Sequence, residues 1–388
     1  MANNPMDYYL VDEMFSADER AVRDTVRKFV DREVKPIIGE AWLKGEFPTH
    51  LIPKMAELGL FGPTLPEEYG GAGLSPIAYG LMMQELERGD SGLRSFASVQ
   101  SSLSMFAIFR FGTEEQRRRW LPQMTAGKVI GCYGLTEPDA GSDPGAMLTR
   151  AKKTDKGWVL DGVKRWITNG TLAGVAVVWA KDDNGQIQGF LVEKDQPGLT
   201  TVDMKTKVSM RASITSELYL DGVEVPESNR LPGVKGLGSA LSCLTEARYG
   251  IAWGVVGAAM DCLKEAIDYT ATRTVFGQPL AAKQLTQERL TDMLARVVDG
   301  QLLAARLGQI KTVGKLTYAH VSLAKRENVR RSLEVARMDR ELLGANGITV
   351  EYNAIRHMVN LETVDTYEGA YEVHSLIVGR DLTGQAAF

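Results

Sequence analysis

The first third of the chain has the apolar spacing of amphipathic helices. Ser16 and Glu19 match a capping box that starts the first of them. Further helices are predicted over 52–58, 77–88, 95–109 and 114–124, and the first helix has an apolar face of Val22, Val26, Phe29 and Val30. The glycines within 67–73 mark a loop between them. We therefore predict an N-terminal α-helical domain over residues 1–128.

The pattern changes to strands between Gly131 and about Pro232. Runs of β-branched and aromatic residues predict strands at 158–160, 175–179, 190–192 and 218–220. Short hairpin signals lie at Asp161-Gly162, Asn184-Gly185 and Asp221-Gly222. These features predict a middle antiparallel β domain over residues 129–238.

Helical spacing returns after Gly238 and continues almost to the end. Helices are predicted over 242–272, 281–313 and 318–343, with a last one after Ala370. Three of them exceed the mean helix length of about 11–12 residues, and long helices in succession favour an up-down bundle. We predict a C-terminal four-helix bundle over 239–388. The order α, β, α is an α+β fold that lacks the βαβ alternation of a Rossmann enzyme.

Composition narrows the function classes. A chain of 388 residues fits two to three domains, and its net charge of −4 argues against a nucleic-acid binder. Three scattered Cys and four His give neither a disulfide framework nor a metal site. The apolar run at 249–260 is too short to span a membrane, and the acidic start is unlike a transit peptide. We expect a soluble cytoplasmic bacterial enzyme, or a mitochondrial matrix enzyme if a presequence has been removed.

Three local patterns are set aside. Gly89-Asp-Ser-Gly92 is similar to a serine-protease segment but lies between helical patterns. Gly236-Leu-Gly238 is half of a dinucleotide fingerprint without its strand–helix unit. Cys132 fits a small buried residue better than a nucleophile.

Four segments have residue types suited to chemistry, and each has an ordinary alternative. The 133–144 segment suits backbone contact with a ligand, or is a plain loop. Trp166 and Thr168 suit a flat heterocycle, or Trp166 is a core residue. Arg273 suits a phosphate, or is a surface charge. Glu368, on a short turn, is either a base or a solvated acid.

Together and in this order, these segments resemble the acyl-CoA dehydrogenase family over essentially the whole chain. The matching motifs are Tyr-Gly-Leu-Thr-Glu-Pro at 133–138, Trp-Ile-Thr at 166–168, Arg-x-x-Phe-Gly at 273–277 and Tyr-Glu-Gly at 367–369. The resemblance implies the same three-domain fold, FAD as cofactor, and a homotetramer with FAD between subunits. It also implies electron-transferring flavoprotein as the electron acceptor.

Within the family, the chain resembles the glutaryl-CoA dehydrogenases through 85–95, 98–102, 246–254 and 357–369. Arg94 and Ser95 are the decisive pair. A dicarboxylic acyl tail buries a carboxylate, which is costly unless it is paired and hydrogen-bonded. Arg94 and Ser95 supply those bonds, whereas a monocarboxylic tail does not need them.

The resemblance also implies site residues. Glu368 is the expected base that removes the α-proton of the thioester. Expected substrate contacts are Glu87, Arg94, Ser95, Ser142, Leu241, Ser242, Cys243, Leu244, Thr245, Arg248 and Tyr367. Expected FAD contacts are Tyr133, Gly134, Leu135, Thr136, Gly141, Ser142, Trp166, Ile167, Thr168, Arg273, Phe276, Gln284, Glu341, Leu342, Leu343, Gly344, Ala345, Gly369 and Phe388. The chain has Ala370 where the family usually has Thr, which removes one hydroxyl bond to FAD.

The implied reaction is the oxidative decarboxylation of glutaryl-CoA to crotonyl-CoA and CO2, a step of amino-acid degradation. Glu87, Thr168 and Tyr367 match the decarboxylating pattern. Alternatives are a non-decarboxylating glutaryl-CoA dehydrogenase, a short-chain acyl-CoA dehydrogenase, an acyl-CoA oxidase, and a non-catalytic protein that binds CoA or flavin. We expect no nucleic-acid partner and no membrane insertion.

Overall fold

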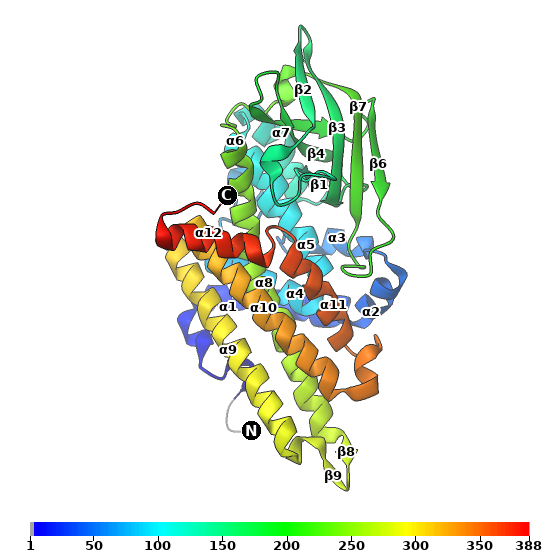
Figure 1. Ribbon diagram of the computed structural model, residues 1–388, viewed down its shortest axis with the longest axis vertical. Coiled ribbons are helices and arrows are strands. Elements are labelled where there is room, and N and C mark those ends of the chain that lie inside the picture. The colour runs from blue at the N-terminus through cyan, green and yellow to red at the C-terminus, as the bar shows by residue number, and fades with distance from the viewer. Residues whose placement is uncertain (1–3, 388) are drawn as a thin grey trace.

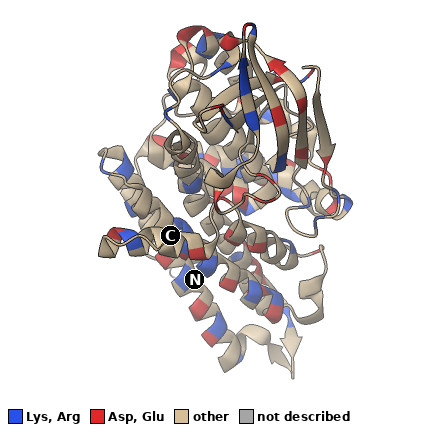
Figure 2. Ribbon diagram, turned by 45° about the horizontal axis from the view of Figure 1, so that its top comes forward, with Lys and Arg blue, Asp and Glu red and all other residues tan. Residues whose placement is uncertain are grey.

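The structure is a computed structural model that describes residues 4–387. A β sheet lies at one end of the molecule and long helices extend from it to the other end (Figure 1). Lys and Arg are mixed with Asp and Glu on both the helices and the sheet (Figure 2), in keeping with the net charge of −4. Among the described residues, no helix is long and apolar enough to cross a membrane.

The N-terminal region is helical, as predicted. Its helices are α1 (Ala17–Phe29), α2 (Lys35–Lys44), α3 (Ile52–Glu57), α4 (Pro76–Gly89), α5 (Ser91–Ser98), α6 (Phe106–Phe111) and α7 (Glu114–Thr125). The predicted capping box is present, with Ser16 N–H donating to Glu19 at 2.9 Å and Glu19 N–H donating to Ser16 Oγ at 3.2 Å. The helix predicted over 95–109 starts earlier and contains a π-helical segment, Val99–Met105.

The middle region is one seven-stranded sheet. Its strands are β1 (Gly131–Gly134), β2 (Arg150–Thr154), β3 (Gly157–Thr168), β4 (Val175–Lys181), β5 (Ile187–Glu193), β6 (Leu199–Asp203) and β7 (Thr215–Val225). The order is β1-β4-β2-β3-β7-β6, with β5 also on β4. Most pairings are antiparallel, but β1 runs parallel to β4, and β2 meets β4 in parallel at one position.

Two of the three hairpin signals are wrong. Asn184-Gly185 does form the turn between β4 and β5. Asp161-Gly162 and Asp221-Gly222 instead lie inside β3 and β7, where the register shifts. Gly162 and Gly222 have φ angles of +151° and +61°, and Gly222 N–H donates to the Asp161 carboxylate at 2.8 Å. These glycines therefore supply positive φ for facing β-bulges rather than for turns.

The C-terminal region is a helical bundle. Its elements are α8 (Leu237–Thr272), a small hairpin of β8 (Thr274–Val275) and β9 (Gln278–Pro279), α9 (Gln284–Thr312), α10 (Tyr318–Leu342), α11 (Ala354–Thr366) and α12 (Tyr371–Thr383). Helix α10 packs against α8, α9, α11 and α12, and α8 also packs against α4 of the N-terminal region. The domain boundaries at 128/129 and 238/239 stay predictions.

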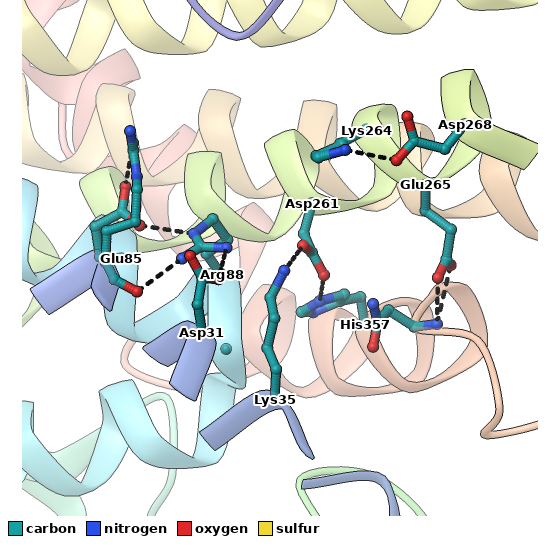
Figure 3. Close-up of polar contacts among 12 residues, drawn as sticks. Asp31, Lys35, Glu85, Arg88, Asp261, Lys264, Glu265, Asp268 and His357 are labelled. Carbon is teal, nitrogen blue, oxygen red and sulfur yellow. Dashed lines mark hydrogen bonds and ion pairs between the residues drawn. The ribbon is translucent and has the colours of Figure 1, made fainter. Parts of the chain in front are cut away.

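Helix α11 has no counterpart among the predicted ranges. The inward face of α11 includes Arg356, His357 and Asn360 as well as apolar residues. The sequence therefore lacks the regular apolar spacing that predicts a helix. Ion pairs and hydrogen bonds hold α11 in place. Asp261 on α8 contacts both Lys35 and His357 Nε2, while Glu265 accepts from the N–H groups that start α11 at 2.9–3.0 Å (Figure 3). Because α11 leads directly to the 367–369 turn, these contacts position that turn.

Candidate active site

Tyr367, Glu368 and Gly369 form a tight turn between α11 and α12. Glu368 has φ +49° and Gly369 has φ +97°. Arg248 on α8 donates from Nε to the Glu368 carbonyl at 2.6 Å. Lys325 on α10 donates to the carbonyls of Tyr367 and Gly369 at 3.0 and 2.7 Å. Two cationic side chains therefore hold the backbone of this turn.

The Glu368 side chain is only partly free in this setting. The residue is half-buried, and its Oε2 is enclosed without a hydrogen-bond partner among residues 4–387. Burial raises the pKa of its carboxyl, while Arg94, Arg248 and Lys325 act in the opposite direction. A carboxylate with a raised pKa and an unused oxygen is suited to accept a proton.

A second polar cluster lies beside the turn and is fully buried. Glu87 on α4 and Arg94 on α5 are both 0% exposed and are joined from Arg94 Nε to Glu87 Oε2 at 2.7 Å. Arg94 Nη2 also contacts Glu87 at 3.4 Å and donates to the Tyr367 hydroxyl. Burial opposes the charge of Arg94, but the Glu87 carboxylate outweighs it and raises the guanidinium pKa. Arg94 therefore stays charged at any relevant pH.

One donor of this cluster is unused. Arg94 Nη1 is buried and has no hydrogen-bond partner within the described residues. Gly254 on α8 makes room for the pair, since a Cβ there would lie 2.2 Å from a Glu87 oxygen and 3.3 Å from the Arg94 side chain. The buried cluster thus keeps one charged N–H for a group that the chain itself does not supply.

The other expected substrate residues lie in three places: on α5, at the start of α8 and in the loop after β1. Ser95 is buried on α5, and Leu241, Ser242, Leu244 and Thr245 are half-buried at the start of α8. Cys243 is 0% exposed within the hydrophobic core, where its thiol donates to the Ser239 carbonyl at 3.6 Å. Ser142 is exposed on the loop after β1. The start of α8 is joined to β1 because the Tyr133 hydroxyl donates to the Ala240 carbonyl at 2.9 Å.

The expected flavin residues of the β domain are partly buried and partly at an exposed edge: Tyr133, Gly134 and Leu135 are buried, whereas Gly141, Ser142 and Trp166 are exposed. Trp166 is 54% exposed with φ +64°, so it is not a core residue. The neighbouring Arg165 N–H donates to the Thr136 carbonyl at 2.9 Å, which joins this edge to the loop after β1. Ile167 points into the sheet core at 2% exposure, so only its backbone faces the edge. The Arg165 guanidinium lies over the exposed Trp166 ring at 5.3 Å from its centroid. An exposed indole with Thr168 near it in the chain, and with Thr136 bonded to the neighbouring Arg165, fits the flat ring of a flavin.

Comparison with known proteins gives a family. Models of the acyl-CoA dehydrogenase N-terminal, middle and C-terminal domains match residues 16–128, 132–223 and 234–383. This chain belongs to the acyl-CoA dehydrogenase family. A glutaryl-CoA dehydrogenase from Mycobacterium smegmatis, solved in complex with FADH2, is 49% identical to it with a TM-score of 0.98, and each chain is covered over 100% of its length.

Two further relatives are less similar to this acyl-CoA dehydrogenase. A glutaryl-CoA dehydrogenase in complex with glutaryl-CoA is 31% identical with a TM-score of 0.92 and covers 95% of this chain and 96% of its own. The mitochondrial short-chain specific acyl-CoA dehydrogenase of Bos taurus is 36% identical over 93% of this chain and 89% of its own. The predicted family and three-part fold are therefore confirmed.

Of the remaining expected FAD residues, Gly369 lies in the turn itself, whereas those within 273–284 and 341–345 do not join the site around Glu368. They lie at the far end of α8, which has 36 residues and is therefore about 54 Å long. Phe276 there is 98% exposed with φ +49° on the β8–β9 hairpin. Arg273, Gln284, Glu341, Gly344 and Ala345 are also exposed, while Leu342 and Leu343 are buried. Phe388 lies outside the described residues.

Sequence reasoning missed two buried groups beside the turn. Lys325 is 1% exposed, and His374 on α12 is 0% exposed with neither ring nitrogen bonded within residues 4–387. A Cβ on Gly369 would come within 2.7 Å of His374 Nε2. The available signal was helical spacing, since Val321, Lys325 and Asn328 share the inward face of α10.

Proposed function

We propose that this acyl-CoA dehydrogenase oxidises and decarboxylates glutaryl-CoA to crotonyl-CoA and CO2. The cofactor is FAD, which supplies the acceptor for the β-hydrogen, as a hydride, when bound. Trp166, Thr136 and Thr168 would hold its ring, together with Tyr133, Gly134, Leu135, Gly141, Ser142 and Gly369. The observation that carries the choice of substrate is the unpartnered Nη1 of the buried Arg94.

The charges around the turn support a substrate with one distal carboxylate. Arg94 is the charged side chain there whose buried Nη1 donor has no partner among the described residues. A carboxylate at the end of a five-carbon acyl chain would pair with that donor. An acyl tail without that carboxylate leaves the Nη1 donor buried and unpaired, which is unfavourable by about 1–3 kcal/mol.

Glu368 is the proposed base for the α-proton. Its backbone N–H donates to no backbone acceptor among the described residues, so it is free to bind the thioester carbonyl. A hydrogen bond there stabilises the negative charge that develops on the carbonyl oxygen as the α-proton leaves. The raised pKa of the Glu368 carboxyl improves its match to that proton.

Decarboxylation uses the same residues. Oxidation places a double bond between the α and β carbons, so loss of CO2 from the distal carboxylate leaves an anion delocalised onto the thioester. The proton that Glu368 has taken returns to the γ-carbon of that anion and gives the crotonyl product. Glu87, Arg94 and Tyr367 surround the proposed carboxylate position and control whether CO2 leaves. Ser95 and the 241–248 segment complete the proposed thioester site.

The far end of α8 suggests how the enzyme assembles. The FAD residues there, Arg273, Phe276, Gln284 and Glu341 to Ala345, lie too far along α8 from Arg248 to touch the same cofactor. They would contact the FAD of a neighbouring subunit, as a homotetramer requires. Electron-transferring flavoprotein is the proposed acceptor, and a bacterial cytoplasm or mitochondrial matrix is the proposed location.

Product analysis tests the function. Purified enzyme is mixed with glutaryl-CoA labelled with 14C at the distal carboxylate and with an artificial electron acceptor. We expect one labelled CO2 for each crotonyl-CoA formed. Glutaconyl-CoA without CO2 would instead assign a non-decarboxylating enzyme. Oxidation of butyryl-CoA but not glutaryl-CoA would assign a short-chain enzyme, which the 36% identity to the bovine protein makes the second candidate.

A further inference from the structure

We propose that Lys325 is a positioning residue that holds the 365–369 backbone in the conformation that presents Glu368 to the substrate. The proposal rests on the proposed function of Glu368 as the base. Lys325 is not itself in contact with substrate in this scheme. It acts through the main chain of the turn, from a neighbouring helix.

The contacts of the ammonium group support this role. Its three donors match three carbonyls of one turn: Gly369 at 2.7 Å, Tyr367 at 3.0 Å and Asp365 at 3.4 Å. The last carbonyls of a helix lack partners within the helix, and a cation near them is favourable. Lys325 thus binds the end of α11 and the turn that follows it with one side chain.

The turn has few other restraints. Ala370 is the N-cap residue of α12, and its methyl side chain cannot accept a hydrogen bond from the first N–H groups of that helix. Glu368 has φ +49°, a backbone conformation that is unfavourable by about 1–3 kcal/mol for residues other than Gly. The other restraints on the turn are the 2.6 Å bond from Arg248 to the Glu368 carbonyl, the bond from Arg94 to the Tyr367 hydroxyl, and the Tyr367 N–H bond to the Thr363 carbonyl. None of these bonds involves the carbonyls of Tyr367 and Gly369, so loss of Lys325 removes the donor to both.

The burial of Lys325 is unusual for a lysine. It is 1% exposed and makes no ion pair within 4 Å among residues 4–387. Lys164, also buried, contacts the Glu137 carboxylate directly at 2.7 Å. A buried ammonium without a paired carboxylate depends on the carbonyls around it. For Lys325, those carbonyls belong to the catalytic turn and to the last turn of α11.

The surroundings of Lys325 are charged on several sides. Glu368 and Asp365 face it from the turn and α11, Arg248 from α8 and Arg94 from α5. Burial lowers the Lys325 pKa to about 7, and the two carboxylates oppose that effect. In return, the Lys325 charge lowers the pKa of Glu368. Removing the charge should therefore move the ionisation of Glu368 to higher pH.

The chain offers a matched control in Lys207. This lysine is half-buried and likewise donates to two main-chain carbonyls, those of Met210 and Ser213, both at 2.8 Å. Burial lowers its pKa to about 8. It holds the loop between β6 and β7 rather than the 365–369 turn. If Lys325 only stabilised the fold, replacing Lys325 and replacing Lys207 would have the same kind of effect, namely a loss of stability.

The experiment compares Lys325→Met, Lys325→Arg and Lys207→Met as FAD-loaded enzymes. We expect Lys325→Met to lower kcat about 100-fold, the size of effect that a small misplacement of a reacting group produces. In a plot of kcat against pH, the fall in kcat on the acid side (the acid limb) should move to higher pH for this variant. Amide deuterium exchange in residues 365–371 should increase. Lys325→Arg should keep the wild-type acid limb and recover part of kcat. Lys207→Met should lower the melting temperature without moving the acid limb.

The proposal is overturned if Lys325→Met lowers only the melting temperature, as Lys207→Met does, and keeps the acid limb and the exchange of 365–371. Failure of the proposed function has a different signature, because the wild-type enzyme then oxidises neither glutaryl-CoA nor butyryl-CoA. Deuterium exchange is measured in either case, so the positioning role is tested without turnover. If Lys325→Met does not fold, Lys325→Arg still tests it through kcat and exchange.

Discussion

The two ends of helix α8 differ in what they leave incomplete. Near its start, Arg248 faces a buried group of charges in which nearly every donor and acceptor is paired within one chain. At its far end, Phe276 is 98% exposed on a short hairpin, next to exposed charged and small residues. The first end leaves a few buried polar atoms without partners among the described residues, namely Arg94 Nη1, Glu368 Oε2 and the ring nitrogens of His374. The second end leaves a whole surface exposed.

The comparison indicates two kinds of binding site. A nearly closed polar cluster with one open donor selects a small ligand by its chemistry, because an unpaired buried group is unfavourable. An exposed aromatic on a hairpin suits a large surface, because its binding energy comes from area removed from water. We therefore propose that the first end determines substrate specificity and that the second forms the contact between subunits around FAD.

The largest effect should come from Glu368→Gln. Loss of the base should lower kcat with glutaryl-CoA by about 10⁴-fold, measured by dye reduction. Bound FAD should remain, so the protein should stay yellow. Because burial raises the pKa of Glu368, removing its charge should not lower the melting temperature at pH 7. Glu372→Gln, an exposed acid on α12, is the control. Substantial activity in Glu368→Gln would remove this residue from the catalytic role.

Phe276→Ser should have the next largest effect and should act at the opposite end of α8. We expect weaker FAD retention and partial dissociation of the oligomer, by about 2 kcal/mol if Phe276 anchors the interface. Gel filtration and flavin absorbance measure both. Val313→Ser, 65% exposed at the other end of α9, is the control. Unchanged FAD content and size in Phe276→Ser would break the proposed division between the two ends.

His374→Gln should change how stability depends on pH. Burial lowers the His374 pKa to about 3, and the charges of Lys325 and Arg248 add to that effect. Below about pH 6.5 the unfolded chain takes up a proton that the folded protein excludes, so the free energy of unfolding falls with pH. Urea unfolding at pH 7 and pH 5 should show the variant losing about 1–2 kcal/mol less than wild type. His357 is present in both proteins, so its contribution to the pH dependence cancels when the variant is compared with wild type. Equal losses would mean that His374 is protonated in the folded state.

Ala370→Thr should have the smallest effect. Ala370 has the extended backbone of an N-cap residue, φ −64° and ψ 160°, but no side-chain acceptor. A Thr hydroxyl there should cap α12 and raise stability by about 1 kcal/mol. Thermal unfolding of the apoprotein isolates this effect from FAD binding. A lower melting temperature would show that the turn has no room for the hydroxyl.

Sequence predicted the elements whose signals are local. The Ser16–Glu19 box and the long C-terminal helices are confirmed because caps and periodicity depend only on neighbouring residues. Helix α11 was missed because Arg356 and Asn360 replace apolar residues on its buried face. Their partner, Asp90, is more than two hundred residues away along the chain, so no local pattern reveals them.

The site was predictable in part. The resemblance brought Glu87, Arg94 and Tyr367 together, and the structure joins the same three residues. Which donor of Arg94 stays unused depends on side-chain geometry that no motif encodes. Lys325 is absent from any recognised motif because its contacts are to backbone carbonyls, which every residue possesses. Such contacts become visible only in three dimensions.

The central claim is that Arg94 recognises a distal carboxylate, and a two-substrate comparison tests it most directly. The measurement is kcat/KM for glutaryl-CoA and for butyryl-CoA in wild type and in Arg94→Met. We predict that the variant loses about 100-fold or more with glutaryl-CoA, in line with loss of a buried charged contact, and changes far less with butyryl-CoA. Equal losses with both substrates would contradict the assignment and leave Arg94 as a structural partner of Glu87.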